Sequence, residues 1–239
     1  MAEKLDMGPR LRAIAALVPE GCSCLADIGT DHGYVPVSLL LEGRIDRAIA
    51  ADVGALPLDH ARRTAGLYGT AERMDFRLGD GLSVLKPGEA EVIVIAGMGG
   101  DAIAGILAAA AWSRAGTLLL LQPMSKAETL RAWLPANGYA VLAEELVQDK
   151  GVLYPILSVR GGGMPPATEA QAWGGFLLRE DPLWGLYISD RLLRLRRTTA
   201  GLEKAKDPSL SEKRERLLAV IGQLEKWKGE WEYANGAGG

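Results

Sequence analysis

Short apolar runs alternate with longer amphipathic segments along the first two thirds of the chain. The apolar runs have the length of buried strands and lie near residues 23–28, 47–52, 74–78, 91–96, 117–121, 139–148 and 152–159. The segments with helical spacing lie near residues 34–43, 56–68, 99–111 and 126–136. Strands that alternate with helices of this length predict parallel pairing through right-handed crossovers.

The last two predicted strands are joined differently. Only Asp149, Lys150 and Gly151 separate them, a hairpin-type link that predicts antiparallel pairing. Earlier, the runs 92–95 and 118–121 are continuously apolar, as expected of central strands covered on both faces. We therefore predict an α/β fold with a Rossmann-like sheet of five parallel strands plus an antiparallel hairpin. This is the layout of class I methyltransferases, whereas a plain dinucleotide-binding fold usually continues with helix-linked strands.

The final third of the chain has a helical pattern of its own. Residues 161–167 are rich in glycine and proline and would interrupt a helix or a strand, so we predict two domains, 1–163 and 164–239. Beyond the break, apolar positions recur at four-three spacing at Ile188, Leu192, Leu195, Thr199, Leu202, Leu217, Ile221, Leu224 and Trp231. With a turn at Asp207-Pro208, this pattern predicts an α-helical coiled-coil hairpin with a frayed C-terminus.

Composition narrows the class of protein. Hydrophobic residues make up 48% of the chain, which is enough for a packed core, but no apolar run reaches the length of about 18 residues that spans a bilayer. The first residues lack the pattern of a signal peptide. Cys22 and Cys24 are too close for an ordinary disulfide and too few for a zinc site. We expect a cytoplasmic protein without a membrane segment or a metal.

The charge is small and uneven. A net charge of −3 argues against a protein that coats nucleic acid indiscriminately. Residues 176–232 nevertheless carry more basic than acidic groups, while residues 1–160 carry the reverse. An arginine cluster in the tail either contacts RNA phosphates or forms the solvated flanks of the coiled coil, and it consists of Arg191, Arg194, Arg196 and Arg197.

The loop after the first predicted strand is the most informative motif. Asp27, Gly29 and Gly33 have the spacing Asp-x-Gly-x-x-x-Gly, not the Gly-x-Gly-x-x-Gly that binds a pyrophosphate. The carboxylates of Asp27 and Asp31 would repel a pyrophosphate here. A ligand with a cationic centre and a zwitterionic tail fits better, and S-adenosylmethionine is the common metabolite of that kind. The loop therefore favours a methyltransferase over a dehydrogenase.

Three further loops should converge on the same pocket, because the carboxyl ends of parallel strands meet at one edge of the sheet. Asp52 ends the second strand and can accept hydrogen bonds from ribose hydroxyls. Asp80, followed by Gly81, can accept a bond from an adenine amino group. The segment 96–100, Ala-Gly-Met-Gly-Gly, follows the fourth strand, where a substrate base and the reactive methyl group would meet.

Each of these residues also has a purely structural interpretation. Asp52 can cap the following helix, Asp80 can be an ordinary turn residue, and the glycines can serve close packing. His32 either contacts a substrate or cofactor or is structural, and His60 fits a surface or packing role on a helix. Four acidic or glycine-rich loops after four successive strands favour a nucleoside site over coincidence.

Taken together, four segments of the chain resemble a known family. The segments 27–36, 79–82, 96–100 and 121–123 resemble the bacterial tRNA (adenine-N1)-methyltransferases that modify adenine 22 in the D-loop, and the likeness runs from about residue 5 to 230. The Ala-Gly-Met-Gly-Gly element is its most specific part, because it replaces the Asn/Asp-Pro-Pro-Tyr signature of amino-group methyltransferases.

The resemblance implies which residues form the site. The implied contacts to S-adenosylmethionine are Asp27, Gly29, Asp31, His32, Gly33, Asp52, Asp80, Gly81, Ala96 and Gly97. The implied catalytic positions, around the adenine, are Asp31, Gly97, Met98, Gln122 and Pro123. The implied partner is tRNA, and we expect a monomer or a weak homodimer. Two other functions stay open: methyl transfer to a different RNA, protein or small molecule, and a non-catalytic scaffold that binds the cofactor.

Overall fold

The structure is a computed structural model, and it describes residues 5–204 and 208–236. The chain divides into two compact units, Met1–Pro166 and Ala167–Gly239, close to the predicted boundary. The predicted turn residue Asp207, the first four residues of the predicted start and the last three of the predicted frayed end lie outside the described residues.

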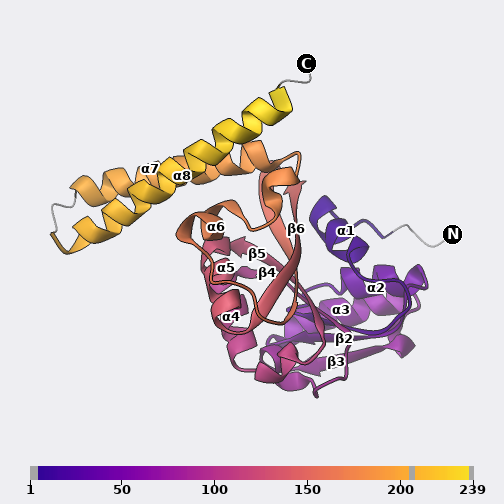
Figure 1. Cartoon of the computed structure of the whole chain (residues 1–239). Coiled ribbons are helices and arrows are strands. Elements are labelled where there is room, and N and C mark those ends of the chain that lie inside the picture. Colours follow the sequence, from indigo (N-terminus) through magenta and orange to yellow (C-terminus); the bar gives the residue numbers. More distant parts are fainter. Residues whose placement is uncertain (1–4, 205–207, 237–239) are drawn as a thin grey trace. The chain divides into compact units, whose positions relative to one another are not determined.

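The first unit is built on one sheet of seven strands (Figure 1). The strands are β1 (Cys22–Ile28), β2 (Ile45–Asp52), β3 (Met74–Leu78), β4 (Val92–Gly99), β5 (Leu118–Ser125), β6 (Tyr139–Asp149) and β7 (Val152–Gly161). Their order is β3-β2-β1-β4-β5-β7-β6. The first five pair in parallel, whereas β7 is antiparallel to both β5 and β6. The predicted fold class is confirmed.

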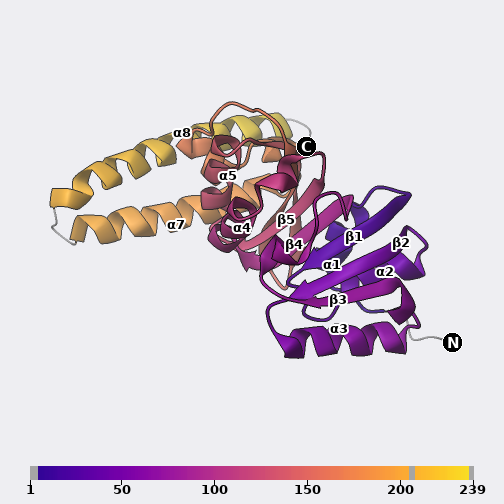
Figure 2. The same cartoon turned by 90° about the horizontal axis from the view of Figure 1, so that it is seen from below.

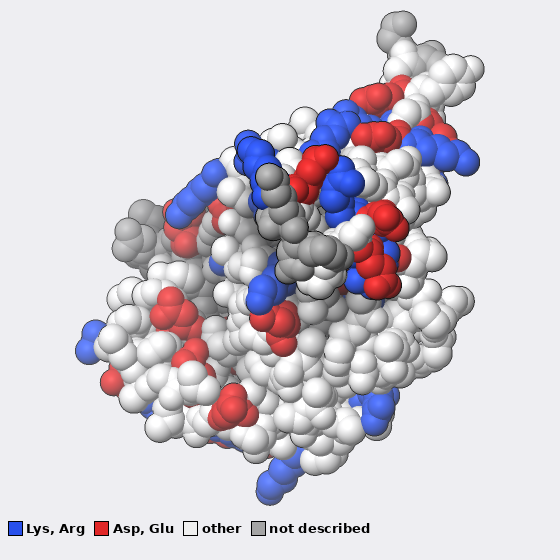
Figure 3. Space-filling model, turned by 90° about the vertical axis from the view of Figure 1, so that its left-hand side faces the viewer, with Lys and Arg blue, Asp and Glu red and all other residues white. Residues whose placement is uncertain are grey.

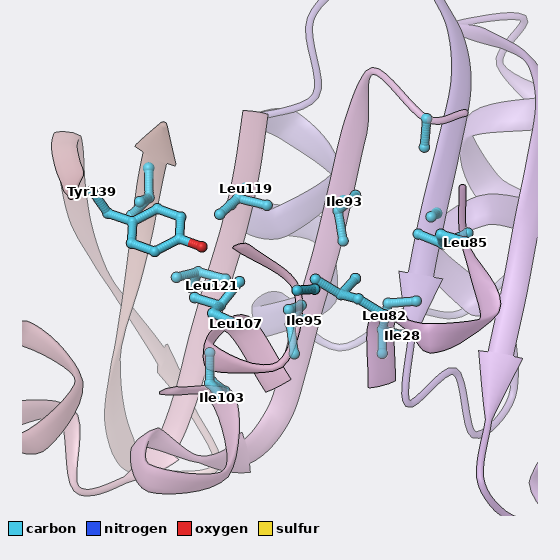
Figure 4. Close-up of a cluster of buried hydrophobic side chains, with 14 of the residues drawn as sticks. Ile28, Leu82, Leu85, Ile93, Ile95, Ile103, Leu107, Leu119, Leu121 and Tyr139 are labelled. Atoms are coloured by element: carbon cyan, nitrogen blue, oxygen red, sulfur yellow. The ribbon is translucent and has the colours of Figure 1, made fainter. Parts of the chain in front are cut away.

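Helices cover both faces of this sheet (Figure 2). The helices of the first unit are α1 (Pro9–Ala16), α2 (Tyr34–Leu41), α3 (Ala55–Leu67), α4 (Gly100–Ala108) and α5 (Ala127–Ala136). Short 3-10 turns are Ala71–Arg73, Gly81–Val84 and Ala111–Arg114. One face packs on α4 through side chains such as Ile103 and Leu107 (Figure 4) and on α5 through Leu130. The other face packs on α1, α2 and α3. The burial of β4 and β5 on both faces explains their continuous apolar runs.

Two features of the first unit differ from the prediction. Helix α1 was not predicted, because its eight residues include two arginines and show only a weak apolar stripe. The segment 96–99 was predicted as a loop, but β4 continues through it beside β5, with register shifts around Met98. Gly97 has φ +81°, and this left-handed backbone allows the irregularity while the strands stay paired.

The second unit is helical. Its helices are α6 (Glu169–Gly174), α7 (Trp184–Lys204) and α8 (Ser211–Gly236), with 3-10 turns at Leu178–Glu180 and Pro208–Leu210. Buried Ile188, Leu195 and Leu224 lie on the predicted stripe. Ion pairs Arg179–Glu230 and Arg196–Glu225 link early positions of the unit to late ones, so α7 and α8 run antiparallel. The predicted helical hairpin is confirmed.

None of the described helices has the length and hydropathy needed to cross a membrane.

Candidate active site

Two cavities open beside the carboxyl ends of β1, β2 and β4. The first has a volume of about 790 Å³ and is lined by residues that include Asp52, Asp80, Gly81, Leu82 and Ile106. The second has a volume of about 500 Å³ and is lined by residues that include Arg10, Asp27, Asp31, His32, Gly33, Ala96 and Gly97. Gly29, Asp52 and Met98 line both cavities, so the two spaces adjoin each other.

The glycines of the first loop have conformations that other residues rarely adopt. Gly29 has φ +77°, and its N–H donates to the carbonyl oxygen of Ala51 at 2.8 Å. A Cβ atom added at Gly29 would collide with Cε of Met98. Gly33 has φ +66° and begins α2, where an added Cβ would lie 3.2 Å from Cβ of Ala61. The loop backbone therefore lies open to the cavities only with glycine at these positions.

Asp27 ends the first apolar strand as a buried carboxylate, 8% exposed. Burial raises the pKa of Asp27 to about 6, the hydrogen bond from Thr30 lowers it, and nearby Asp52 raises it. Oγ1 of Thr30 donates to Oδ2 of Asp27 at 2.6 Å. A cationic group bound in the second cavity would stabilise the ionised form of this carboxylate, so the site is electrostatically suited to a positive ligand.

The acids after β2 and β3 face the first cavity. Oδ1 of Asp52 accepts a hydrogen bond from N–H of Gly54 at 2.7 Å, and Gly54 itself is the N-cap residue of α3. Oδ2 of Asp52 has no hydrogen-bond partner among the described residues. Asp80 is exposed and precedes Gly81, whose φ of +53° turns the chain into the 3-10 helix. Both carboxylates keep acceptor capacity for a ligand.

A stack of three rings lies at the second cavity. The rings of Tyr34 and His32 are 5.1 Å apart, and those of His32 and His60 are 4.8 Å apart, with interplanar angles of 6° and 12°. Both imidazoles approach exposed Asp31, with Nε2 of His32 and Nδ1 of His60 each 3.5 Å from one of its oxygens. The lone pairs of the ring nitrogens lie in the planes of the rings, and two nearly parallel rings cannot direct both lone pairs to one metal ion. The two imidazoles are better placed to contact the two oxygens of a carboxylate.

Gln122 was predicted beside the substrate but lies behind the cavity wall. Its side chain is fully buried, and Oε1 accepts from Nη1 of Arg10 at 2.7 Å and from N–H of Gly97 at 3.2 Å. Nε2 donates to the carbonyl oxygen of Pro123 at 3.0 Å. Neither Gln122 nor Pro123 lines either of these two cavities, whereas Gly97 lines the second and Met98 lines both. Gln122 thus holds the end of β4 against β5 and α1.

The predicted arginine cluster of the tail is mostly paired with acids. Arg191 is buried and pairs with Asp190 at 2.7 Å, and Arg194 pairs with the same carboxylate at 2.9 Å. Arg196 pairs with Glu225 at 2.6 Å. Arg197 is exposed and has no ion-pair partner among the residues that the structure describes. Acidic and basic side chains alternate over the hairpin surface seen in Figure 3, as is typical of solvated helix flanks.

Sequence reasoning missed two members of the site. Arg10 lies on the helix that was not predicted, and His60 lies on α3, where a role in packing or at the surface was expected. His60 reaches Asp31 because α2 and α3 pack side by side, with Gly33 against Ala61. The order of residues along the chain did not predict the contact of Arg10 or that of His60.

Comparison with known proteins gives this geometry a family. Residues 7–157 match the family model described as a methyltransferase domain. The tRNA (adenine(22)-N(1))-methyltransferase of Bacillus subtilis strain 168 is 38% identical over 167 residues, which are 70% of this chain and 70% of that protein.

Solved structures agree over nearly the full chain. The structure of the B. subtilis M1A22 tRNA methyltransferase TrmK has a TM-score of 0.81 at 29% identity and covers 95% of this chain and 99% of its own. Streptococcus pneumoniae Sp1610 in complex with S-adenosyl-L-methionine has a TM-score of 0.77 at 30% identity, over 93% of this chain and 100% of that one.

Proposed function

The chain belongs to the methyltransferase-domain family and, within it, to the tRNA (adenine(22)-N(1))-methyltransferases, and from this premise we propose that it transfers a methyl group from S-adenosylmethionine to N1 of adenine 22 in the tRNA D-loop. The free, buried cysteines fit a reducing cytoplasmic setting. The oligomeric state remains a prediction of a monomer or a weak homodimer.

The observation that carries the proposal is the pair of adjoining cavities with a carboxylate in each position that the cofactor needs. Asp52 and Asp80 lie in the first cavity, where ribose hydroxyls and an adenine amino group would find acceptors. Asp27 lies in the second, suited to the positive end of the amino-acid tail. Gly29 joins the two, and its bare backbone lets the ligand lie across it. The same acids oppose a dinucleotide pyrophosphate.

The reaction requires little from the protein beyond positioning the adenine and the cofactor. Adenine N1 has an in-plane lone pair, so no base has to remove a proton before attack. When bound, the cofactor supplies a methyl group on a positively charged sulfur, a good leaving group. The wall at Ala96, Gly97 and Met98 would orient the base edge toward the bound cofactor, so that its lone pair is in position for attack. Asp31 and the carbonyl oxygens of this wall offset the positive charge that the purine gains.

The base must leave the folded RNA to reach the cavity. Extrusion of a nucleotide costs a few kcal/mol, which contacts elsewhere on the tRNA must offset. We assign part of these tRNA contacts to the helical hairpin. Its exposed Arg197, which has no ion-pair partner among the described residues, can contact a phosphate. The paired arginines, Arg191, Arg194 and Arg196, would contribute only after exchange of their acidic partners.

The decisive experiment is methylation of unmodified tRNA followed by nucleoside mass spectrometry. We expect 1-methyladenosine with the natural tRNA and none with a transcript that carries guanine at position 22. Product from both transcripts would mean another adenine is the target. Cofactor binding without any methylated nucleoside would overturn the tRNA assignment and favour the other acceptor classes or a scaffold.

A further inference from the structure

Arg10 is a half-buried cation in the wall of the second cavity. It forms no ion pair with a carboxylate in the part of the chain that the structure describes, although Asp27, Asp31 and Asp52 line the same cavity. A guanidinium has five N–H donors, and Arg10 uses one nitrogen, Nη1, to bond Gln122 at 2.7 Å. A partly desolvated guanidinium with unused donors is suited to bind an anionic ligand.

The position of Arg10 is fixed from behind. Its partner Gln122 is fully buried, and the orientation of the Gln122 amide is set by N–H of Gly97 on Oε1 and by the carbonyl oxygen of Pro123 on Nε2. The acceptor that holds Arg10 is therefore the same atom that holds the bulged end of β4. This arrangement presents the guanidinium to the cavity in one place, as a preorganised binding group requires.

The surroundings restrict which anion can bind there. A phosphate of RNA would enter a space lined by three carboxylates and would be repelled. A zwitterion meets no such conflict, because its ammonium group lies near an acid while its carboxylate meets the cation. The second cavity adjoins the first through Gly29, Asp52 and Met98, so a ligand whose nucleoside lies in the first extends its tail into the second.

We propose that Arg10 binds the carboxylate of the amino-acid tail of S-adenosylmethionine, opposite Asp27, which faces the ammonium group. This rests on the cofactor part of the proposed function and not on tRNA as the acceptor. It makes Arg10 the residue that recognises the α-amino acid group, and Gln122 a positioning residue that acts through it.

The test compares two ligands on two proteins by calorimetry without tRNA. The ligands are S-adenosylhomocysteine and the analogue in which hydrogen replaces the carboxylate. Wild-type protein should bind the analogue about 10- to 100-fold more weakly, as loss of a charge-assisted hydrogen bond predicts. Arg10→Met should bind both ligands with similar affinity, close to that of wild-type protein for the analogue.

Arg12→Met is the matched control. Arg12 lies on the same helix, is 58% exposed and pairs with Asp6 at 3.9 Å, so this variant should keep the full preference for the carboxylate. Arg10→Lys keeps the charge but lacks the planar fork, and an intermediate preference is expected; it also answers the question if Arg10→Met does not fold.

An unchanged preference for the carboxylate in Arg10→Met would overturn the inference. A separate titration with tRNA in which Arg10→Met loses tRNA affinity, while both small ligands bind as they do to wild-type protein, would instead assign Arg10 to a phosphate. Because no methyl transfer is measured, failure of the tRNA assignment would leave this result intact, and the two outcomes are distinguishable.

Discussion

The terminal methyl group of Met98 occupies the space that a side chain at position 29 would need. The two residues come from the ends of neighbouring strands, β4 and β1, and both line the two cavities. Met98 thus covers the backbone over which the proposed ligand would pass. An unbranched thioether can change rotamer at little energetic expense, so it can move aside when the ligand enters.

Gly29→Ala should therefore weaken both folding and cofactor binding. The strained φ of +77° is expected to lower the free energy of unfolding by about 1–3 kcal/mol. The added methyl group and the displaced Met98 side chain would take up space that the ligand needs, which weakens cofactor binding. Gly43→Ala separates the two effects, since Gly43 has φ +68° but nothing within 4 Å of an added Cβ. Equal cofactor affinity in both variants, measured by calorimetry beside urea unfolding, would contradict the role given to Met98.

Asp27→Asn should stabilise the unliganded protein while it weakens cofactor binding. The pKa of Asp27 is about 6 when folded against 3.8 for the free group, because burial disfavours the charge. The folded state therefore holds a proton that the unfolded state has lost, and stability falls as pH rises from about 4 to 6. At pH 7 we expect the variant to gain about 1–3 kcal/mol.

Urea unfolding at pH 4, 5, 6 and 7 measures this effect. The difference between Asp27→Asn and wild-type protein should grow over that window and level off above it. Cofactor affinity of the wild-type protein should fall as pH drops below about 6, because the carboxylate that would meet the ammonium group becomes protonated. If the free energies of unfolding of Asp27→Asn and wild-type protein differ by the same amount at every pH, their pH dependence does not arise from Asp27.

Asp31→Ala tests the chemistry directly. Asp31 is exposed beside two imidazoles and lines the second cavity, so we expect kcat to fall about tenfold or more while the cofactor Kd changes little. Asp59→Ala is the matched control, since Asp59 is also exposed and pairs with Arg62 on α3 at 3.0 Å. Near-normal turnover of Asp31→Ala in single-turnover assays would remove this residue from catalysis.

Arg197→Ala and Arg196→Ala distinguish a tRNA contact from a solvated helix flank. Arg197 has no acidic partner among the described residues, whereas Arg196 is held by Glu225 at 2.6 Å. If the helical hairpin contacts the phosphate backbone of the tRNA, Arg197→Ala should weaken tRNA binding. It should also reduce the dependence of tRNA affinity on salt concentration by the amount expected for about one phosphate contact. Binding titrations at several salt concentrations that give identical slopes for wild type and both variants would assign the cluster to the flanks.

Sequence patterns predicted what depends on local periodicity. The strands of the sheet and the acids that end them follow from apolar runs and their spacing, and the hairpin at Lys150-Gly151 follows from its length. Contacts that depend on how elements pack were not predictable. His60 meets Asp31 because α2 and α3 pack side by side, with Gly33 against Ala61. Gln122 follows the apolar run of β5 much as Asp27 follows that of β1, yet its polar atoms bond to the protein instead of facing a cavity.

The contact between Arg10 and Gln122 joins positions 112 residues apart. The second cavity is therefore complete only when the segment that precedes β1 lies against β5. A chain shortened to begin at β1 would retain every acidic loop and the whole sheet, but its second cavity would lack the wall that Arg10 provides. Ligand binding in this fold thus reports on the assembly of the earliest part of the chain with one of its later strands.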